Sequence, residues 1–218
     1  MAKRILNMTA EEMTHATKSE LIEAIAGSEG RVLASETIGI TIPLLTDVTN
    51  AEFAASMGAD LILLNMFDVQ EPKIMALPEV EKEETVREVK RLTGRMVGIN
   101  LEPVEESYAS DNKETLWEMS AGRYATVENA IQAQKMGVDL IVLTGNPGNG
   151  VSNPAIISSL KAISEAVGEK IMLAAGKMHA SGIIGEGGEN IITKEDIRQF
   201  AEAGADIILL PAPGTVPG

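Results

Sequence analysis

One pattern of polar and apolar positions recurs three times along the chain. The copies begin at Met57, Met136 and Ala203, and each runs through a glycine and an aspartate into an unbroken apolar stretch. The glycine suits the left-handed conformation that ends a helix. An apolar run without alternation indicates a strand buried on both faces, as in parallel sheets that helices cover.

A second pattern alternates with the first. It begins at Gly30, Gly94 and Gly168 and leads through a basic or polar position into another apolar stretch. Together the patterns predict strands near 31–37, 61–66, 95–102, 139–144, 170–177 and 206–211, with helices near 50–57, 81–93, 126–136, 154–167 and 193–203. Strands alternating with helices predict an α/β fold with right-handed crossovers.

The ends of the predicted strands favour a barrel over an open nucleotide-binding sheet. The first strand runs into Glu36, Thr37 and Ile38 rather than into a glycine-rich phosphate loop. Polar residues follow strand after strand, as at the mouth of a TIM (β/α)8 barrel, so we expect this fold with about six βα units present. We therefore expect one domain, 1–218, that lacks the C-terminal part of its barrel.

The first residues predict a helical extension over 1–29. Thr9 and Glu12 have the spacing of a capping box, which predicts a helix from there to about Ala26. Its apolar stripe suits it to plug the bottom of the barrel or to contact another subunit. Farther along, Asn153 is predicted to cap the helix that begins with Pro154.

Net charge and residue composition limit the kinds of partner that we expect for this protein. A net charge of −14 opposes binding to nucleic acid or to an anionic membrane surface, and leaves a small anionic metabolite in a local pocket as the expected ligand. The absence of cysteine excludes disulfides and thiolate catalysis. No apolar run has the length of a signal peptide or a membrane span, so we expect a cytoplasmic protein. A barrel with an added N-terminal helix is also expected to form a homo-oligomer.

Lys177 is the first candidate for catalysis, because it follows a buried strand and its charge must be paired or desolvated there. Three roles are open: binding a substrate carboxylate or phosphate, acting as an acid or base, and forming a Schiff base with a carbonyl substrate. The competing interpretation is a structural ion pair with Glu36 or Glu102.

Three carboxylates are predicted to share the mouth with this lysine. Glu36 and Glu102 are expected to transfer protons, and Asp68 with Glu102 forms a candidate site for Mg²⁺, which prefers oxygen ligands. The alternative is that these carboxylates are solvated or paired with lysine. By contrast, Asp139 and the other aspartates of the repeated pattern precede their strands, where they are expected to contribute to stability.

Other polar residues near the mouth are candidate substrate ligands. They are Asn65, Asn100, Thr144, Asn146, Gly148, His179 and Arg123. The loop with Asn146 and Gly148 leads into a helix N-terminus, which favours anions. The segment 103–125 is long and holds Tyr108, Trp117 and Tyr124, so it is interpreted as a lid or a subunit contact, or alternatively as a surface helix.

The repeated Gly-Ala-Asp-Leu-Ile-Leu-Leu pattern, with Ala34-Ser35-Glu36-Thr37 in the first strand, resembles the phosphoenolpyruvate mutase-like, phosphate-binding barrels. More closely, the chain resembles a bacterial family of such barrels whose members are often labelled phosphonomutase-like or haloacid-dehalogenase-like hydrolases. The mutase and isocitrate lyase group binds magnesium through strand-end carboxylates and acts on 2-oxo acids through an enolate. The resemblance therefore implies a lyase or mutase with this chemistry.

The leading hypothesis is an enzyme that cleaves or isomerises a carbon–carbon or carbon–phosphorus bond in a small phosphorylated or 2-oxo-acid metabolite. Lys177 would bind or activate the substrate, and amides such as Asn100 would donate hydrogen bonds to the enolate oxygen. Two alternatives are a metabolite-sensing or scaffold barrel without turnover and a Schiff-base aldolase that uses Lys177.

Overall fold

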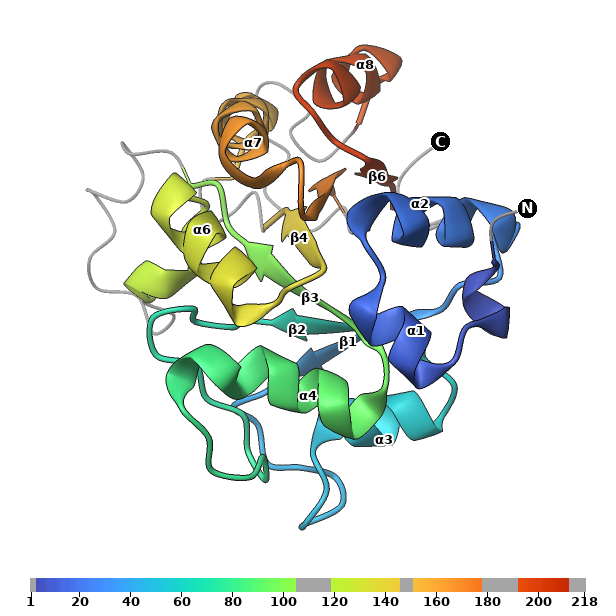
Figure 1. Ribbon diagram of the computed structural model, residues 1–218. Helices are drawn as coiled ribbons and strands as arrows, with labels where there is room; N and C mark the ends of the chain where they lie inside the picture. Colours follow the sequence, from blue (N-terminus) through green and yellow to red (C-terminus); the bar gives the residue numbers. More distant parts are fainter. Residues whose placement is uncertain (1–2, 105–118, 146–150, 178–191, 212–218) are drawn as a thin grey trace.

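The computed structural model shows one curled sheet of six parallel strands, a half-barrel of the TIM type (Figure 1). It describes residues 3–104, 119–145, 151–177 and 192–211. The strands lie side by side in chain order and are β1 (Ala34–Ile38), β2 (Leu61–Asn65), β3 (Met96–Leu101), β4 (Leu140–Leu143), β5 (Met172–Gly176) and β6 (Ile207–Leu209). All six predicted strands are confirmed, with ends that differ by no more than three residues.

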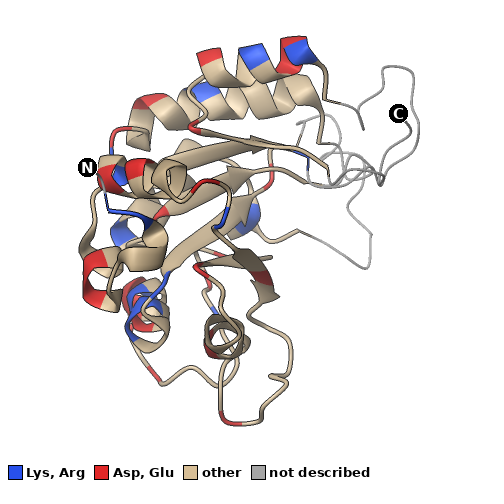
Figure 2. Cartoon of the chain, turned by 90° about the vertical axis from the view of Figure 1, so that its right-hand side faces the viewer, with Lys and Arg blue, Asp and Glu red and all other residues tan. Residues whose placement is uncertain are grey.

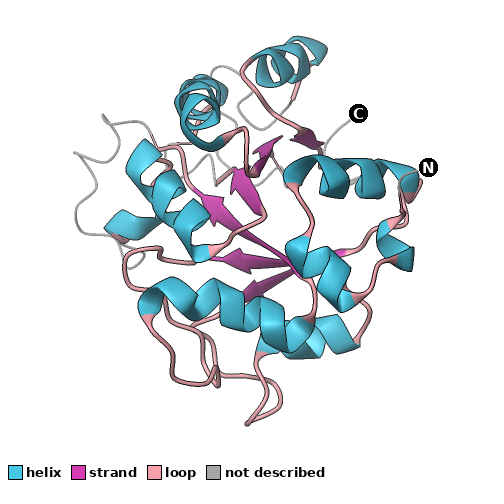
Figure 3. Ribbon diagram, viewed as in Figure 1, coloured by secondary structure: helices cyan, strands magenta, loops and turns pink. Residues whose placement is uncertain are grey.

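Most helices follow the strands along the outside of the sheet. They are α3 (Asn50–Ser56), α4 (Thr85–Thr93), α6 (Val127–Met136), α7 (Asn153–Val167) and α8 (Lys194–Glu202), with short 3-10 turns at Lys82–Glu84 and Ala121–Arg123. Two more helices, α1 (Ala10–His15) and α2 (Lys18–Gly27), lie with the turn Ile5–Asn7 on the other side of the strands (Figure 3). Every helix predicted between strands is confirmed.

The N-terminal helix differs from its prediction, because it is divided in two. The capping box of Thr9 and Glu12 is present, but the helix that it opens ends at His15. Thr17 and Glu20 form a second capping box that begins α2. The start of α7 also differs by one residue: Ser152, rather than Asn153, is the cap, and its side chain accepts a hydrogen bond from the N–H of Ala155.

The strands are buried on both faces by two separate apolar clusters. In β2, for example, Ile62 and Leu64 pack with the outer helices, while Leu61 and Leu63 face the concave side. There, the concave cluster is closed by side chains from the N-terminal segment, including Ile5 and Leu21. The N-terminal segment therefore plugs the barrel, which confirms the first of its two expected roles.

The repeated aspartates hold neighbouring strands in register. Asp60 accepts a hydrogen bond from the N–H of Leu33 (2.9 Å), Asp139 from that of Val97 (2.9 Å), and Asp206 from that of Leu173 (2.8 Å). Each carboxylate thus fixes a residue within one position of the start of the preceding strand. The prediction that the three aspartates serve stability is confirmed.

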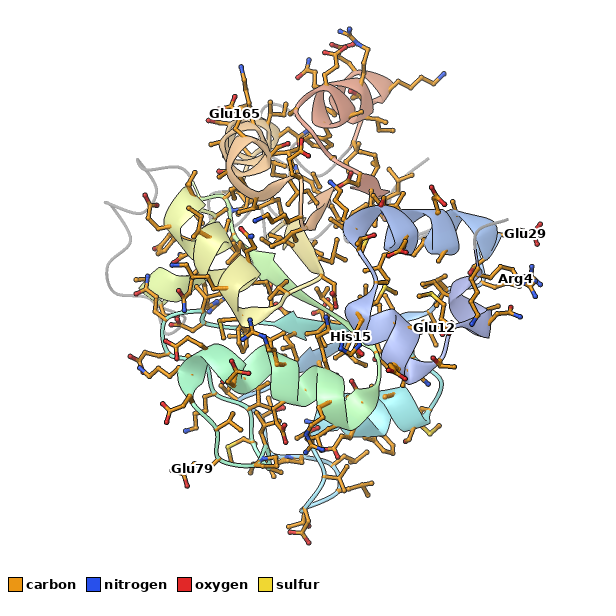
Figure 4. All side chains as sticks on the ribbon, viewed as in Figure 1. Arg4, Glu12, His15, Glu29, Glu79 and Glu165 are labelled. Carbon is orange, nitrogen blue, oxygen red and sulfur yellow. The ribbon has the colours of Figure 1, made fainter. Side chains whose placement is uncertain are left out.

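Basic side chains meet the C-terminal ends of the outer helices, where the helix dipole is negative. Arg95 donates to Ala59 O (2.7 Å), just beyond α3, and Lys18 donates to Gly168 O (2.5 Å), just beyond α7. Lys18 also pairs with Asp206 at 2.8 Å, so α2 is tied to the starts of two strands. Charged residues otherwise lie mainly on the helices and loops around the sheet (Figure 2), and Arg4, Glu29, Glu79 and Glu165 lie at the periphery (Figure 4).

Exposed apolar side chains gather beside β1, the first strand of the sheet. They are Leu33, Ile40, Ile42, Leu44, Leu45 and Met57. A groove of about 510 Å³ runs between β1 and α3 in the same region.

The expectation of a homo-oligomer stays a prediction. Within the described ranges, no helix combines the length and the apolar composition that a membrane crossing requires.

Candidate active site

Polar side chains replace apolar ones where the strands end on the concave face. Along β2, β3 and β4, alternate residues belong to the concave cluster, and the next positions in that alternation are Asn65, Asn100 and Thr144. Glu102 lies two positions beyond Asn100 and is 6% exposed. Strand alternation therefore places an amide, a second amide, a carboxylate and a hydroxyl at one end of the half-barrel, where TIM barrels have their active sites.

The first group of contacts joins β1, β2 and β3. Asn65 Nδ2 donates to Glu36 Oε1 at 2.5 Å. The N–H of Met66 donates to Asn65 Oδ1 (2.8 Å) and to Asn100 Oδ1 (3.0 Å). Met66 has a φ of +57°, a conformation that is uncommon for a residue other than glycine. Backbone conformations of this kind occur often at functional sites, and the two amides hold this one in place.

The second group of contacts is a buried ion pair between Glu102 and Arg123. Arg123 Nη2 donates to Glu102 Oε1, and the two side chains are 15% and 7% exposed. The backbones are also joined: Glu102 N–H donates to Arg123 O at 2.9 Å, and Ala125 N–H donates to Glu102 O at 3.0 Å. Among the described residues, Arg123 Nε is buried without a hydrogen-bond partner. A donor left in this state costs about 1–3 kcal/mol.

Asp68 contacts the segment of chain that carries Arg123. Its Oδ1 accepts hydrogen bonds from the N–H groups of Gln70 (2.7 Å) and Glu71 (3.0 Å). Burial acts to raise the pKa of Asp68, but hydrogen bonds from Ser120 and from these two N–H groups, together with the charge of Arg123, outweigh it. The pKa of Asp68 therefore lies below its usual value. Asp68 is thus held as a charged anchor for the segment that carries Arg123.

Asn129 of α6 fixes that segment on both sides of Arg123. Its Nδ2 donates to Ala121 O (2.8 Å) and to Tyr124 O (2.9 Å), and its Oδ1 accepts from Gln70 Nε2 at 3.1 Å. The sequence analysis missed this residue. The available signal was a polar side chain next to the apolar stripe of a predicted helix, where a buried amide needs several hydrogen bonds.

Lys177 follows β5 and is only 1% exposed, among the most buried of the large side chains. The residue before it, Gly176, has a φ of +142°, and a Cβ at Gly176 would lie 2.3 Å from Leu209 O. Glycine is therefore required where the chain leaves β5 and turns into Lys177. The prediction that Lys177 is buried at a strand end is confirmed.

The predicted site residues fall into three sets. Glu36, Asn65 and Asn100 are brought together by hydrogen bonds, and Glu102 is brought together with Arg123. Thr144 and Lys177 are buried at the ends of β4 and β5. Of the remaining candidates, Asn146, Gly148 and His179 lie outside the described residues, as do Tyr108 and Trp117 of the expected lid.

Arg123 supplies positive charge to both candidate magnesium ligands, Asp68 and Glu102. Glu102 is paired with its guanidinium, and the Asp68 Oδ1 oxygen is turned toward two backbone N–H groups. Within the part of the chain that the structure describes, no three carboxylate, histidine or cysteine side chains are grouped to hold a metal ion. These residues as placed do not fit a resident magnesium ion, and the magnesium site stays a prediction.

Comparison with protein families gives one match, to the family described as Domain of unknown function (DUF7916), over residues 6–218. The chain belongs to this family. A search of curated proteins by sequence found no match.

Solved structures share the fold of this DUF7916 member. One is 2,3-dimethylmalate lyase, a member of the PEP mutase/isocitrate lyase superfamily (TM-score 0.53, 12% identity, 92% of this chain and 62% of that one). Another is the carboxyl transferase domain of Rhizobium etli pyruvate carboxylase (TM-score 0.52, 16% identity, 94% and 31%). A protein described as a phosphonomutase from Burkholderia cenocepacia J2315 also matches (TM-score 0.49, 16% identity, 82% and 68%).

The likenesses to the lyase and to the carboxyl transferase domain show the fold. The chain spans about 62% of the length of the lyase and 31% of that of the carboxyl transferase structure. Neither the lyase nor the carboxyl transferase structure supports the haloacid-dehalogenase-like label that the resemblance carried.

Proposed function

We propose that this protein is an enzyme that cleaves or isomerises a carbon–carbon or carbon–phosphorus bond in a small 2-oxo acid or phosphorylated carbonyl metabolite. The observation that carries the proposal is the complete burial of Lys177 at the end of β5, on the same edge of the sheet as the buried Glu102–Arg123 pair at the end of β3. Buried charges are costly unless they are paired, and enzymes place such groups at active sites.

The amides and the lysine suit an enolate. Asn100 uses its Oδ1 for the N–H of Met66, which leaves its amide nitrogen, among the described contacts, as the end that can donate to a substrate. Both ends of the Asn65 amide are hydrogen-bonded: Nδ2 donates to Glu36, and Oδ1 accepts from the N–H of Met66. A fixed amide donor and an ammonium stabilise the negative oxygen that develops when a bond next to a carbonyl breaks.

The carboxylates and the arginine supply the other functions of such a reaction. Arg123 presents a guanidinium for the anionic group of the substrate, since its planar fork matches a carboxylate or phosphate. Glu102 and Glu36 are the groups that accept or donate the proton.

A Schiff-base aldolase is the second candidate, and the same burial of Lys177 favours it. A lysine removed from water is one of the groups that can attack a carbonyl carbon. Borohydride added with pyruvate or dihydroxyacetone phosphate would reduce the adduct and add a stable mass to the peptide containing Lys177. Failure to form any adduct across such carbonyl compounds would refute this candidate.

The leading proposal is tested by turnover of the full chain. We would incubate it, with and without magnesium, with a panel of 2-oxo acids, their 2-hydroxy precursors and phosphonates, and follow bond cleavage by NMR. Turnover of one substrate should fall by at least about a hundredfold in Lys177→Ala. It should be unchanged in Lys161→Ala, which removes an exposed lysine of α7. Binding of these compounds without any turnover would instead indicate a sensing barrel.

A further inference from the structure

The pairing of Arg123 with Glu102 leaves part of the arginine fork unused. Arg123 contacts Glu102 through Nη2, while its Nε, on the same edge of the guanidinium, is buried and has no hydrogen-bond partner among the described residues. An anion with two coplanar oxygens can bind both nitrogens of this edge at once. Glu102, as placed, satisfies only one of them.

The backbone holds both residues in place whether or not their side chains touch. Glu102 and Tyr124 form a parallel bridge, with hydrogen bonds from Glu102 N–H to Arg123 O and from Ala125 N–H to Glu102 O. Asn129 adds two hydrogen bonds to carbonyls on either side of Arg123. The side-chain contact can therefore be exchanged without moving the strand or the segment beyond it.

The second carboxylate oxygen of Glu102 lies near Gly145, two residues beyond the end of β4. A Cβ at Gly145 would lie 3.4 Å from Oε2 and 2.7 Å from Val151 Cγ2. Glycine at 145 therefore leaves room for Val151 to pack beside the carboxylate. The negative charge of Asp68 stabilises the positive charge of Arg123, and the arginine in turn contributes to the lowered pKa of Asp68.

We propose that the carboxylate of the substrate displaces Glu102 from Arg123, binds the Nε–Nη2 edge with both oxygens, and frees Glu102 to act as the base. The inference rests on the proposed function and makes it more specific, because the substrate must carry a carboxylate. Glu102, buried and without its counter-charge, then takes a proton from the carbon next to the carbonyl group. The C–H electrons pass into the enolate, and the proton stays on Glu102.

The test is calorimetry with oxalate, a planar dianion that has no carbon-bound hydrogen. The titration of the full chain is repeated at one pH in MES and in imidazole, whose heats of ionisation differ, so that the number of protons taken up on binding is measured. We expect the wild-type protein to take up a proton when oxalate binds, up to about one for each oxalate. Here the proton comes from the solvent and stays on the freed Glu102.

Variants identify the group that takes the proton. Glu102→Gln should abolish the uptake and bind oxalate roughly tenfold more tightly, because a neutral amide competes less well for the arginine. Arg123→Lys should weaken binding at least about tenfold, since the fork is lost. Glu195→Gln removes the carboxylate of an exposed ion pair on α8 and should behave as the wild type.

The outcomes separate this inference from the proposed function. Oxalate binding without proton uptake by the wild type, or with weaker binding by Glu102→Gln, overturns the exchange and leaves the enzyme proposal standing if substrates are turned over. Linked proton uptake without turnover of any substrate supports the exchange and counts against the enzyme. Absence of oxalate binding overturns the exchange outright. The wild-type result decides the question even if Glu102→Gln fails to fold.

Discussion

Gly176→Ala connects the fold to the candidate site in one substitution. Gly176 has a φ of +142°, and a Cβ there would lie 2.3 Å from Leu209 O, the backbone oxygen of its partner on β6. Contacts below 3.0 Å essentially do not occur for a Cβ, so the strands must separate by at least about 0.7 Å. The backbone oxygen belongs to the sheet itself and cannot turn away as a flexible side chain would.

Two contributions set the expected size of the effect. Holding an alanine at this φ costs about 1–2 kcal/mol. Disturbing the pairing of β5 with β6 removes about one hydrogen bond, or about 1 kcal/mol more. We therefore expect the free energy of unfolding to fall by about 2–3 kcal/mol in Gly176→Ala.

Gly58→Ala is the matched control. Gly58 also has a positive φ, +102°, but a Cβ there would meet nothing within 4 Å. It should lose only the conformational part, about 1–2 kcal/mol. Urea unfolding followed by circular dichroism gives both values, provided that the m-values of the variants match that of the wild type. Equal losses in the two variants would show that the close approach of β5 and β6 is not what requires glycine at 176.

Three further perturbations test other parts of the account. The pKa of Asp68 is lowered, so its charged form adds stability above its usual pKa, and this stability is lost as the pH falls through the lowered value. Asp68→Asn should therefore reduce the acid sensitivity of unfolding below about pH 5, and an unchanged pH profile would contradict this. Asp206→Asn should lower the free energy of unfolding in urea by about 2 kcal/mol, because it also removes the ion pair of the half-buried Lys18. Asp60→Asn, which removes a hydrogen bond to a backbone N–H, should lower it by about 1 kcal/mol, and the reverse order would refute the role of the ion pair. Phe200→Ala removes the one fully buried side chain of α8 and should lower the free energy of unfolding in urea by about 3–5 kcal/mol. A loss below about 1 kcal/mol would show that Phe200 does not anchor α8.

The architecture could be predicted because its determinants are local. The glycine that ends each helix, the aspartate after it and the apolar run that follows are neighbours in sequence, and Gly58, Gly137 and Gly204 all have the positive φ that the pattern implied. The division of the first helix was also encoded locally, in the capping box of Thr17 and Glu20. That second signal was overlooked because the apolar stripe continues across the break.

The candidate site could be predicted only in part. Alternation along a strand determines which face Asn65 and Asn100 share, so their meeting at the mouth followed from the sequence. The pairing of Glu102 with Arg123 joins residues 21 positions apart, and it depends on how the chain returns to the end of β3. The role of Asn129 likewise appears only when the carbonyl groups around Arg123 are placed. Contacts of this kind arise from tertiary geometry rather than from periodicity.

The most direct test of the central claim is the stabilisation of the full chain by oxalate, measured for the wild type and for Lys177→Ala. At a hundred times its dissociation constant, oxalate should raise the free energy of unfolding of the wild type by about 2.7 kcal/mol. We expect Lys177→Ala to lose most of this increase, while Lys161→Ala retains it. Equal stabilisation of the wild type and Lys177→Ala would contradict an anion site centred on the buried lysine.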